Sequence, residues 1–354
     1  MDIESRSPKI IIVGGSNSLR KNGWVSCFEE AYTGPHSIDN MSIGGASTIM
    51  GVYRSFFSNN IRKNDVVVWE YALNDANFFE IGKCRIEILL RHVEHLIRRC
   101  AQKGALFVPV IMSTLRQESR RGLDQYRAQL HYLFSHYKID FLDVSFHMRH
   151  KLGAPALGRE YYDDGNHYAL GGEVVSEIGK ILPEYIKNSL PIDINKFRPL
   201  FVPRGVQVRL IDNFDNGDSN IFENSVFRAK THAPGDQPIV ARNDSFGAGF
   251  LTGLVVVTTS KGGVIDLGIN GEKYAISLVS DERSFRKPVL KFITLSAALG
   301  KEILLEKNSE ISIGWSNSKP PFSADLGCSI NPKDVEIALR EASIVGLMCE
   351  LSNI

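Results

Sequence analysis

Four short stretches of the sequence combine residue types and spacings that could carry out nucleophilic catalysis. The first is Gly14-Gly15-Ser16, which follows the apolar run Lys9–Val13. Its two glycines permit a sharp turn that would lift the Ser16 hydroxyl to the end of a strand. An ordinary strand-exit turn is the alternative, and a dinucleotide-binding loop is disfavoured because the third glycine of GxGxxG is missing. Ser18 is a rival nucleophile, set back by its greater distance from the strand.

The second stretch is Asp164-Gly165-Asn166-His167. A spacing of three residues in a turn puts both side chains on one side, so the Asp164 carboxylate can accept a hydrogen bond from His167 Nδ1. The other ring nitrogen is then free to take a proton from a serine hydroxyl. An Asp-x-x-His spacing is weak on its own and gains weight only in combination with the other stretches.

The remaining two stretches could hold the negative charge that develops on a substrate oxygen. Ala72-Leu73-Asn74-Asp75 follows the apolar run Asp65–Tyr71, and its Asn74 amide could donate to an oxyanion. A turn-forming Asn-Asp pair is the alternative. The stretch Asn40–Gly45 ends the second apolar run, where a glycine N–H could approach a substrate oxygen. The alternative is that these are ordinary loop glycines without a catalytic role.

The elements that must position these stretches are short apolar runs that alternate with amphipathic segments of helical length. In Ile86–Lys103 the apolar residues recur at i, i+3, i+4 and i+7, which predicts one buried stripe on a helix. Strand–helix alternation predicts a mostly parallel sheet covered by helices on both faces, with ligands at the carboxyl ends of the strands. The predicted strands are Lys9–Val13, Ile38–Ile43, Asp65–Tyr71, Ala105–Ile111 and Ile139–Val144. The predicted helices are Gly23–Tyr32, Thr48–Phe57, Ile86–Lys103, Gly122–Tyr137 and Gly171–Ile186.

The second half of the chain has a different rhythm. Residues 191–203 contain three prolines and predict a linker between a first domain at 1–190 and a second at 204–354. Beyond it, short runs rich in Val, Ile and Thr are separated by turn residues, and Asn270-Gly271 between two of them is a strong hairpin signal. This pattern predicts an all-β sandwich or jelly roll. The runs are Val206–Ile211, Gly249–Thr259, Val264–Ile269, Lys273–Val279, Val289–Leu295 and Ile311–Trp315.

Taken together, the four stretches resemble the blocks of the SGNH (GDSL-like) hydrolase family over about residues 8–186. Block one, Gly-Asp-Ser, is matched by Gly14-Gly15-Ser16, and the block-two glycine by Gly45. Block three, Gly-x-Asn-Asp, is matched by Ala72–Asp75, and block five, Asp-x-x-His, by Asp164–His167. The sequence departs from the family at Gly15, where Asp is usual, and at Ala72, where Gly is usual. Neither position supplies the nucleophile, the base or an oxyanion donor.

The resemblance implies a three-layer α/β/α flavodoxin-like domain and an acyl-enzyme mechanism. In it, Ser16 attacks an ester carbonyl, His167 removes the serine proton and Asp164 orients the imidazole. The N–H groups of Ser16 and Gly45 and the amide of Asn74 would form the oxyanion hole, and no cofactor or metal is required. The appended β domain favours a glycan ester, so the expected activity is that of a carbohydrate O-acetylesterase. A glycan O-acetyltransferase with the same triad and an inactive glycan-binding or assembly protein are the alternatives.

The composition is that of an ordinary globular protein, with 354 residues of which 43% are hydrophobic and 23% charged. The 41 Lys and Arg balance the 40 Asp and Glu, which argues against a nucleic-acid partner and gives no reason to expect a membrane surface. Five scattered cysteines without a CxxC pair favour free buried thiols in a reducing compartment. Neither a signal peptide nor an apolar run of membrane-spanning length is recognised, so a cytoplasmic protein is expected. The oligomeric state stays open.

Several other polar groups have simpler explanations than a ligand site. Two histidine pairs lack a third metal ligand, an acidic loop misses EF-hand spacing, a tryptophan fits a helix core, and an arginine run fits an exposed helix start. These groups are His92/His95 and His147/His150, Asp212–Asp218, Trp24, and Arg116, Arg120 and Arg121.

Overall fold

The computed structural model describes residues 6–57, 61–82, 84–119, 124–224, 227–242, 247–280, 287–320 and 339–352. The chain divides into two compact units between Val202 and Pro203. The first unit is an α/β domain and the second is an all-β domain, as the sequence predicts.

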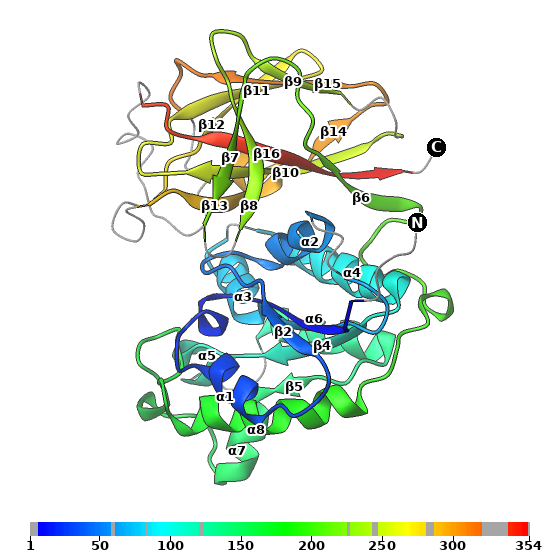
Figure 1. Ribbon diagram of the computed structural model, residues 1–354, viewed down its shortest axis with the longest axis vertical. Helices are drawn as coiled ribbons and strands as arrows, with labels where there is room; N and C mark the ends of the chain where they lie inside the picture. Colours follow the sequence, from blue (N-terminus) through cyan, green and yellow to red (C-terminus); the bar gives the residue numbers. More distant parts are fainter. Residues whose placement is uncertain are drawn as a thin grey trace. The chain divides into compact units, whose positions relative to one another are not determined.

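A parallel sheet of five strands forms the middle of the first unit (Figure 1). Its order is β2-β1-β3-β4-β5, the order of the flavodoxin-like fold, and β1 lies between β2 and β3 where the direction of winding changes. Register pairs Ile12 with Asn40 and Gly14 with Glu70, so these strands end together at one edge. The strands are β1 (Lys9–Gly14), β2 (Ser37–Asn40), β3 (Val66–Glu70), β4 (Leu106–Ile111) and β5 (Leu142–Asp143).

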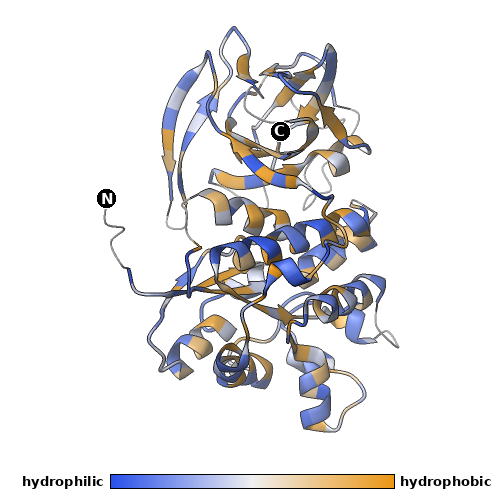
Figure 2. Ribbon diagram, turned by 90° about the vertical axis from the view of Figure 1, so that its right-hand side faces the viewer, coloured by the Kyte–Doolittle hydropathy of each residue, from blue (hydrophilic) through white to orange (hydrophobic). Residues whose placement is uncertain are grey.

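Helices cover both faces of this sheet. On one face α1, α7 and α8 pack around a core that includes Ile10, Ile12 and Val68, and on the other α2, α4 and α6 pack against one another. Hydrophobic and hydrophilic residues alternate along these helices, which fits one buried and one exposed face (Figure 2). The helices are α1 (Trp24–Ala31), α2 (Thr48–Phe57), α3 (Ala72–Glu80), α4 (Ile86–Lys103), α5 (Leu115–Ser119), α6 (Gln125–Tyr137), α7 (Val144–Leu152) and α8 (Glu173–Asn188), with short 3-10 turns η1 (Ser16–Ser18), η2 (Arg159–Tyr161) and η3 (Ile194–Lys196).

The structure differs from the predicted elements mainly around β5 and α3. The apolar run predicted as a strand over Ile139–Val144 forms only the two-residue strand β5, because the Asp143 carboxylate accepts the N–H of Phe146 at 2.8 Å and so begins α7. Ala72–Asp75 is the first turn of α3 and not an isolated turn. The bounds of α2 and α4 agree with the prediction, and α4 ends where Gly104 adopts φ +70°.

The segment after α8 is bound to the first unit. Glu94 of α4 is fully buried, and its carboxylate accepts the backbone N–H groups of Leu200, Phe201 and Val202 at 2.6–2.7 Å. The Tyr137 hydroxyl donates to the same carboxylate at 2.6 Å. The end of the predicted linker is thus fixed by one side chain, immediately before the division between the units.

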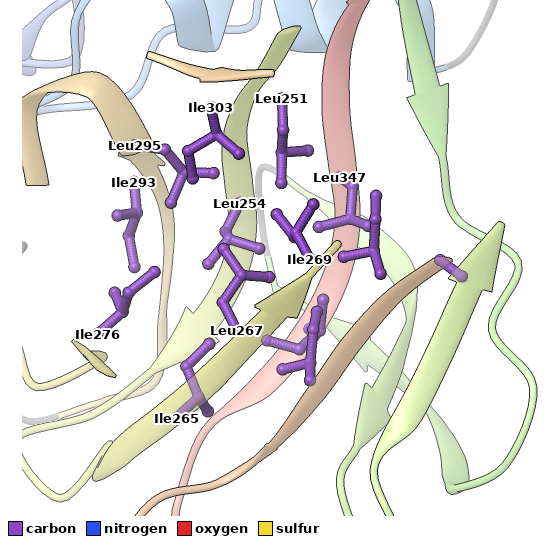
Figure 3. Packing of buried hydrophobic residues seen from close by; sticks show 14 of the residues in the cluster. Leu251, Leu254, Ile265, Leu267, Ile269, Ile276, Ile293, Leu295, Ile303 and Leu347 are labelled. Atoms are coloured by element: carbon purple, nitrogen blue, oxygen red, sulfur yellow. The ribbon is translucent and has the colours of Figure 1, made fainter. Parts of the chain in front are cut away.

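The second unit is a sandwich of two antiparallel sheets. One sheet runs β13-β10-β16-β8-β7, with β14 paired to β10 and β6 to β16, and the other runs β12-β11-β15-β9. Leu251 and Leu254 of one sheet and Leu267 of the other meet in a common core (Figure 3). The elements are β6 (Val206–Ile211), β7 (Asp218–Glu223), β8 (Arg228–Ala233), β9 (Ile239–Arg242), β10 (Gly249–Thr258), β11 (Val264–Ile269), β12 (Glu272–Ser277), β13 (Val289–Thr294), α9 (Leu295–Leu299), β14 (Ile303–Leu305), β15 (Glu310–Trp315) and β16 (Ser343–Ser352).

The hairpin predicted at Asn270-Gly271 joins β11 to β12. Both residues have positive φ, +51° and +82°, as a two-residue turn matching the strand twist requires. The long central strand β16 was not predicted, although eight of its ten residues are buried. Within the part of the chain that the structure describes, no helix is both long and apolar enough to cross a bilayer. The described cysteines (Cys27, Cys84, Cys100 and Cys349) are free thiols, and Cys328 lies outside the described residues.

Candidate active site

Ser16 lies where β1 leaves the sheet. Gly14 ends the strand, Gly15 continues in an extended conformation, and Ser16 begins the single turn η1. The Gly15 N–H donates to Glu70 Oε2 at 3.1 Å, and the Ser18 hydroxyl donates to the same oxygen at 2.7 Å. The loop is therefore held from beneath by the last residue of β3, while the Ser16 side chain is left half-buried.

A chain of two short hydrogen bonds connects Ser16 to Asp164. Ser16 Oγ lies 2.7 Å from His167 Nε2, and His167 Nδ1 lies 2.7 Å from Asp164 Oδ2. An ionised carboxylate can only accept, so we assign the ring proton to Nδ1 and leave Nε2 as the acceptor for the serine hydroxyl. This is the arrangement needed for the imidazole to withdraw the serine proton.

The Asp164 carboxylate is stabilised within its own turn. Its Oδ1 accepts the N–H groups of Asn166 at 2.7 Å and His167 at 2.9 Å, while Oδ2 faces the ring. Burial alone would raise the pKa of Asp164, but these N–H groups and the His167 ring outweigh it and hold the pKa below its usual value. The carboxylate is thus kept ionised beside the imidazole.

Contacts from two other segments fix the turn that bears His167. Asn17, buried in η1, donates from Nδ2 to the Asn166 carbonyl at 3.0 Å and accepts the Tyr168 N–H at 3.3 Å. From the other side, the Leu115 N–H of α5 donates to the Gly165 carbonyl at 3.0 Å. The Ser16–His167 distance therefore depends on Asn17, which neighbours the serine in sequence.

The Asn74 side chain lies against the backbone that precedes Ser16. A Cβ atom built on Gly15 would lie 2.3 Å from Asn74 Oδ1, a distance that side chains do not tolerate. The amide of Asn74 thus occupies the space that a side chain at position 15 would fill. A side chain at position 15 would require the Asn74 amide to move.

The loop after β2 brings Gly44 next to the nucleophile, and Gly45 follows it. A Cβ on Gly44 would lie 3.6 Å from Ser16 Cβ, whereas one on Gly45 would meet nothing within 4 Å. Gly45 is exposed and has φ +67°, a conformation that glycine adopts without strain. The Ile43 N–H donates to the Gly14 carbonyl at 3.0 Å and so ties this loop to the end of β1.

Two buried carboxyl groups beneath the site were not predicted. Burial raises the pKa of Glu70 to about 7, although its hydrogen bonds from Ser18 and Gly15 oppose the rise. Asp75, also buried, accepts the Thr48 N–H at 2.9 Å, the Thr48 hydroxyl at 2.6 Å and the Tyr126 hydroxyl at 2.8 Å. Its burial raises its pKa to about 7. An acid at the end of the otherwise apolar run Val66–Glu70 is the sequence signal that could have revealed Glu70.

The other polar groups considered in the sequence analysis are not part of the Ser16–His167–Asp164 arrangement. Trp24 is a core residue of α1 with 1% exposure, which favours the structural interpretation. His92 and His95 are buried in α4, and His147 Nε2 lies 3.0 Å from Glu177 Oε1. Among the residues described, no group of three His, Cys, Asp or Glu side chains could hold a metal ion. Arg116 pairs with Glu80, whereas Arg120 and Arg121 lie outside the described residues.

Comparison with known proteins gives a likeness in fold. No protein-family model and no curated protein matches the chain. A crystal structure of a two-domain esterase active on acetylated mannans, co-crystallised with mannopentaose, matches 98% of this chain and 91% of its own, with a TM-score of 0.60 and 11% identity. The chain has the fold of a two-domain esterase.

A second structure of a two-domain esterase active on acetylated mannans gives the same result. It matches 98% of this chain and 92% of its own length, with a TM-score of 0.56 and 12% identity. Both matches extend over the α/β unit and the β sandwich, so the two-domain esterase fold accounts for the second unit as well as the first.

Proposed function

We propose that the chain is a serine carboxylic ester hydrolase. The observation on which this rests is the continuous pair of 2.7 Å contacts from Ser16 Oγ through the His167 ring to Asp164. A hydroxyl, an imidazole and a carboxylate in this order are the parts of a nucleophilic triad, and they lie at the carboxyl edge of a parallel sheet next to its switch point. The two-domain esterase fold supports the same activity.

In the proposed reaction, Ser16 Oγ attacks the ester carbonyl as its proton passes to His167 Nε2. The carbonyl oxygen becomes an oxyanion, and the Ser16 N–H, the Gly45 N–H and the Asn74 amide are the proposed donors to it. Collapse of this intermediate expels the alcohol, which takes the proton from His167 and leaves an acyl group on Ser16. Water, deprotonated by His167, then attacks the acyl group and releases the acid and the free serine.

For the substrate we propose an O-acetylated carbohydrate. The full-length structural match is to an esterase active on acetylated mannans, and this chain shares with it a β sandwich after the α/β unit. The proposal is therefore that a sugar hydroxyl is the leaving group and acetate the acid released.

The test of the nucleophile is covalent labelling with a fluorophosphonate. Wild-type protein should be labelled at Ser16, and Ser16→Ala should abolish both labelling and hydrolysis of an aryl acetate. Ser18→Ala is the matched control, because the Ser18 hydroxyl is buried and bonded to Glu70. Label at Ser18, or labelling that persists in Ser16→Ala, would contradict the assignment.

The substrate is tested separately by acetate release. Acetylated mannan, acetylated xylan and an aryl acetate should be compared at equal ester concentration. We expect release from at least one polysaccharide that is lost in Ser16→Ala. Turnover of the aryl acetate without release from either polysaccharide would leave an ester hydrolase and refute the carbohydrate substrate.

A further inference from the structure

A cavity of about 630 Å³ lies in the first unit, apart from the triad. It is lined by residues of α5, α6, α7 and α8 and of the edge strand β5, and neither Ser16, Asp164 nor His167 borders it. Its volume falls in the range of about 300–1,000 Å³ typical of small-ligand sites. The proposed hydrolysis gives this cavity no role.

An internally compensated ion pair borders the cavity. Arg127 Nε donates to Asp143 Oδ2 at 3.0 Å, its Nη2 donates to Oδ1, and its Nη1 donates to the Ser113 hydroxyl at 2.7 Å. His131 Nε2 lies 3.4 Å from the same carboxylate. Burial alone would raise the pKa of Asp143, but His131, Arg127 and the Phe146 N–H hold it below its usual value. The pair is ionised and neutral as a unit.

The remaining charges around the cavity also balance. Arg149 and Glu118 line it with opposite signs, so the Arg and Asp or Glu side chains of the lining sum to zero. Three histidines (His131, His147 and His150) also line the cavity, so the lining as a whole is balanced when their imidazoles are neutral, and a neutral ligand then meets no uncompensated charge. Glu118 is 7% exposed; its Oε2 accepts the Leu157 N–H at 3.3 Å, while Oε1 is buried with no hydrogen-bond partner among the described residues.

Aromatic rings complete the lining. Phe141, Phe146 and Tyr185 border the cavity beside these polar groups. Phe146 is 64% exposed, an unusual state for a phenylalanine on a helix whose other large apolar residues, such as Met148, are buried. A flat apolar ring next to polar side chains is typical of a site for a ligand with both an apolar face and polar edges.

We propose that this cavity binds a saccharide ring. A pyranose is neutral, presents C–H groups that stack on an aromatic face, and carries hydroxyls that both donate and accept. The hydroxyls would hydrogen-bond to polar groups of the lining such as the Arg149 guanidinium, while the ring would stack on Phe146. This binding site is separate from the triad and does not rest on the proposed hydrolysis.

The test uses the full-length Ser16→Ala variant, which cannot turn over a substrate. Mannopentaose, xylopentaose and cellopentaose are each added, and binding is followed by calorimetry and by hydrogen exchange of peptides that cover α7. We expect at least one oligosaccharide to slow exchange in α7. Adding Phe146→Ala should weaken that binding about tenfold, because truncating a central contact costs on the order of 1–2 kcal/mol, and Phe146→Tyr should restore it.

Tyr132→Ala is the matched control. Tyr132 is a similarly exposed aromatic residue of α6, at 57%, and does not line the cavity. The variant that carries Tyr132→Ala should bind the oligosaccharide with the same affinity as the Ser16→Ala protein. Absence of protection in α7 with all three oligosaccharides, or equal affinity with and without Phe146→Ala, would overturn the proposal. Either result would leave the labelling of Ser16 unaffected, so failure here is distinct from failure of the hydrolase proposal.

Discussion

Acidic residues at the carboxyl edge of the parallel sheet fall into two layers, an upper layer formed by Asp164 and a lower layer formed by Glu70 and Asp75. The two layers differ in exposure, in the direction of their pKa shifts and in the sequence distance to their partners. In the upper layer, Asp164 has 56% of its side chain exposed and a lowered pKa, and its partner His167 is three residues away in sequence. In the lower layer, Glu70 and Asp75 are almost completely buried, have raised pKa values, and accept hydrogen bonds from residues 27 to 55 positions away.

The difference follows from what each layer has to do. In the proposed mechanism Asp164 stays ionised and orients the His167 imidazole, which changes its charge during the reaction, and Asp164 is itself oriented by N–H groups of its own turn. A supporting group must hold segments that are distant in the chain, and burial makes each of its hydrogen bonds costly to break. We therefore expect changes in the upper layer to affect the rate of catalysis, and changes in the lower layer to affect stability and its pH dependence.

The largest expected effect comes from removing the base. His167→Ala should lower kcat for an aryl acetate by about 10⁶-fold, and Asp164→Asn by about 10⁴-fold. The midpoint of thermal unfolding should change little, because the two side chains are 25% and 56% exposed. A large loss of stability in either variant would contradict the expectation that the upper layer affects catalysis and only the lower layer affects stability.

The next effect concerns the proposed oxyanion donor. Asn74→Ala should lower kcat by about 10²- to 10³-fold with little change in KM, because the amide is expected to act on charge that is present only in the transition state. Asn77→Ala, three residues along α3, is the matched control and should retain full activity. Gly15→Ala should resemble Asn74→Ala, since the added Cβ would displace the Asn74 amide. Wild-type activity in Asn74→Ala would remove Asn74 from the mechanism.

A third prediction extends the comparison to Glu94, a buried carboxylate remote from the triad. Glu94→Ala leaves the N–H groups of Leu200, Phe201 and Val202 without their acceptor. We expect a loss of about 3 kcal/mol in the free energy of unfolding, measured by urea denaturation, and faster hydrogen exchange over residues 194–202. Unchanged exchange in that segment would show that Glu94 does not hold it. Labelling of Ser16 should persist at temperatures where the variant is folded.

The smallest effect is the pH dependence produced by Glu70. Its pKa of about 7 lies above the ordinary value of 4.5, so the folded state holds the proton more tightly than the unfolded state. Stability therefore falls as pH rises from about 4.5 to 7, and levels off above that. Glu70→Gln should flatten this part of the curve, leaving the similar contribution of Asp75. Denaturation at pH 5, 6, 7 and 8 provides the measurement, and an unchanged slope would contradict the prediction.

The two layers also differ in how far the sequence predicts them. The Ser16 and Asn74 stretches were recognised because each follows an apolar run, and the Asp164–His167 stretch because of its local spacing; the structure brings Ser16 and His167 within 2.7 Å. Glu70 and Asp75 were not recognised as a layer, since their partners Gly15, Ser18 and Thr48 become neighbours only when β3 and α3 pack. The proposed role of Gly45 remains a prediction, and the structure adds Gly44 as the residue beside Ser16.

Prediction of the elements was limited by the same physics. The strands β1, β3 and β4 are continuous apolar runs and the helix α4 has an apolar period that extends over many residues, and these elements were found at nearly their observed bounds. The predicted strand Ile38–Ile43 is shorter, since β2 ends at Asn40. The short strand β5 was overestimated, because capping by Asp143 is a side-chain event that hydrophobic periodicity does not report. In the sandwich, β11 was predicted at its observed bounds, whereas β16 was missed because Gly346 and Glu350 interrupt its apolar residues.

The turn that contains both Asp164 and His167 has a consequence for the history of such a site. Because the carboxylate and imidazole belong to one turn, they move together, and the Ser16–His167 separation depends on what holds this turn to the rest of the fold. A lineage could lose or regain activity through a change at Asn17, whose side chain holds the turn in place, while all three reacting residues persist. An intact set of Ser, Asp and His in a relative is therefore an incomplete guide to its activity; the residues that hold the turn must be inherited as well.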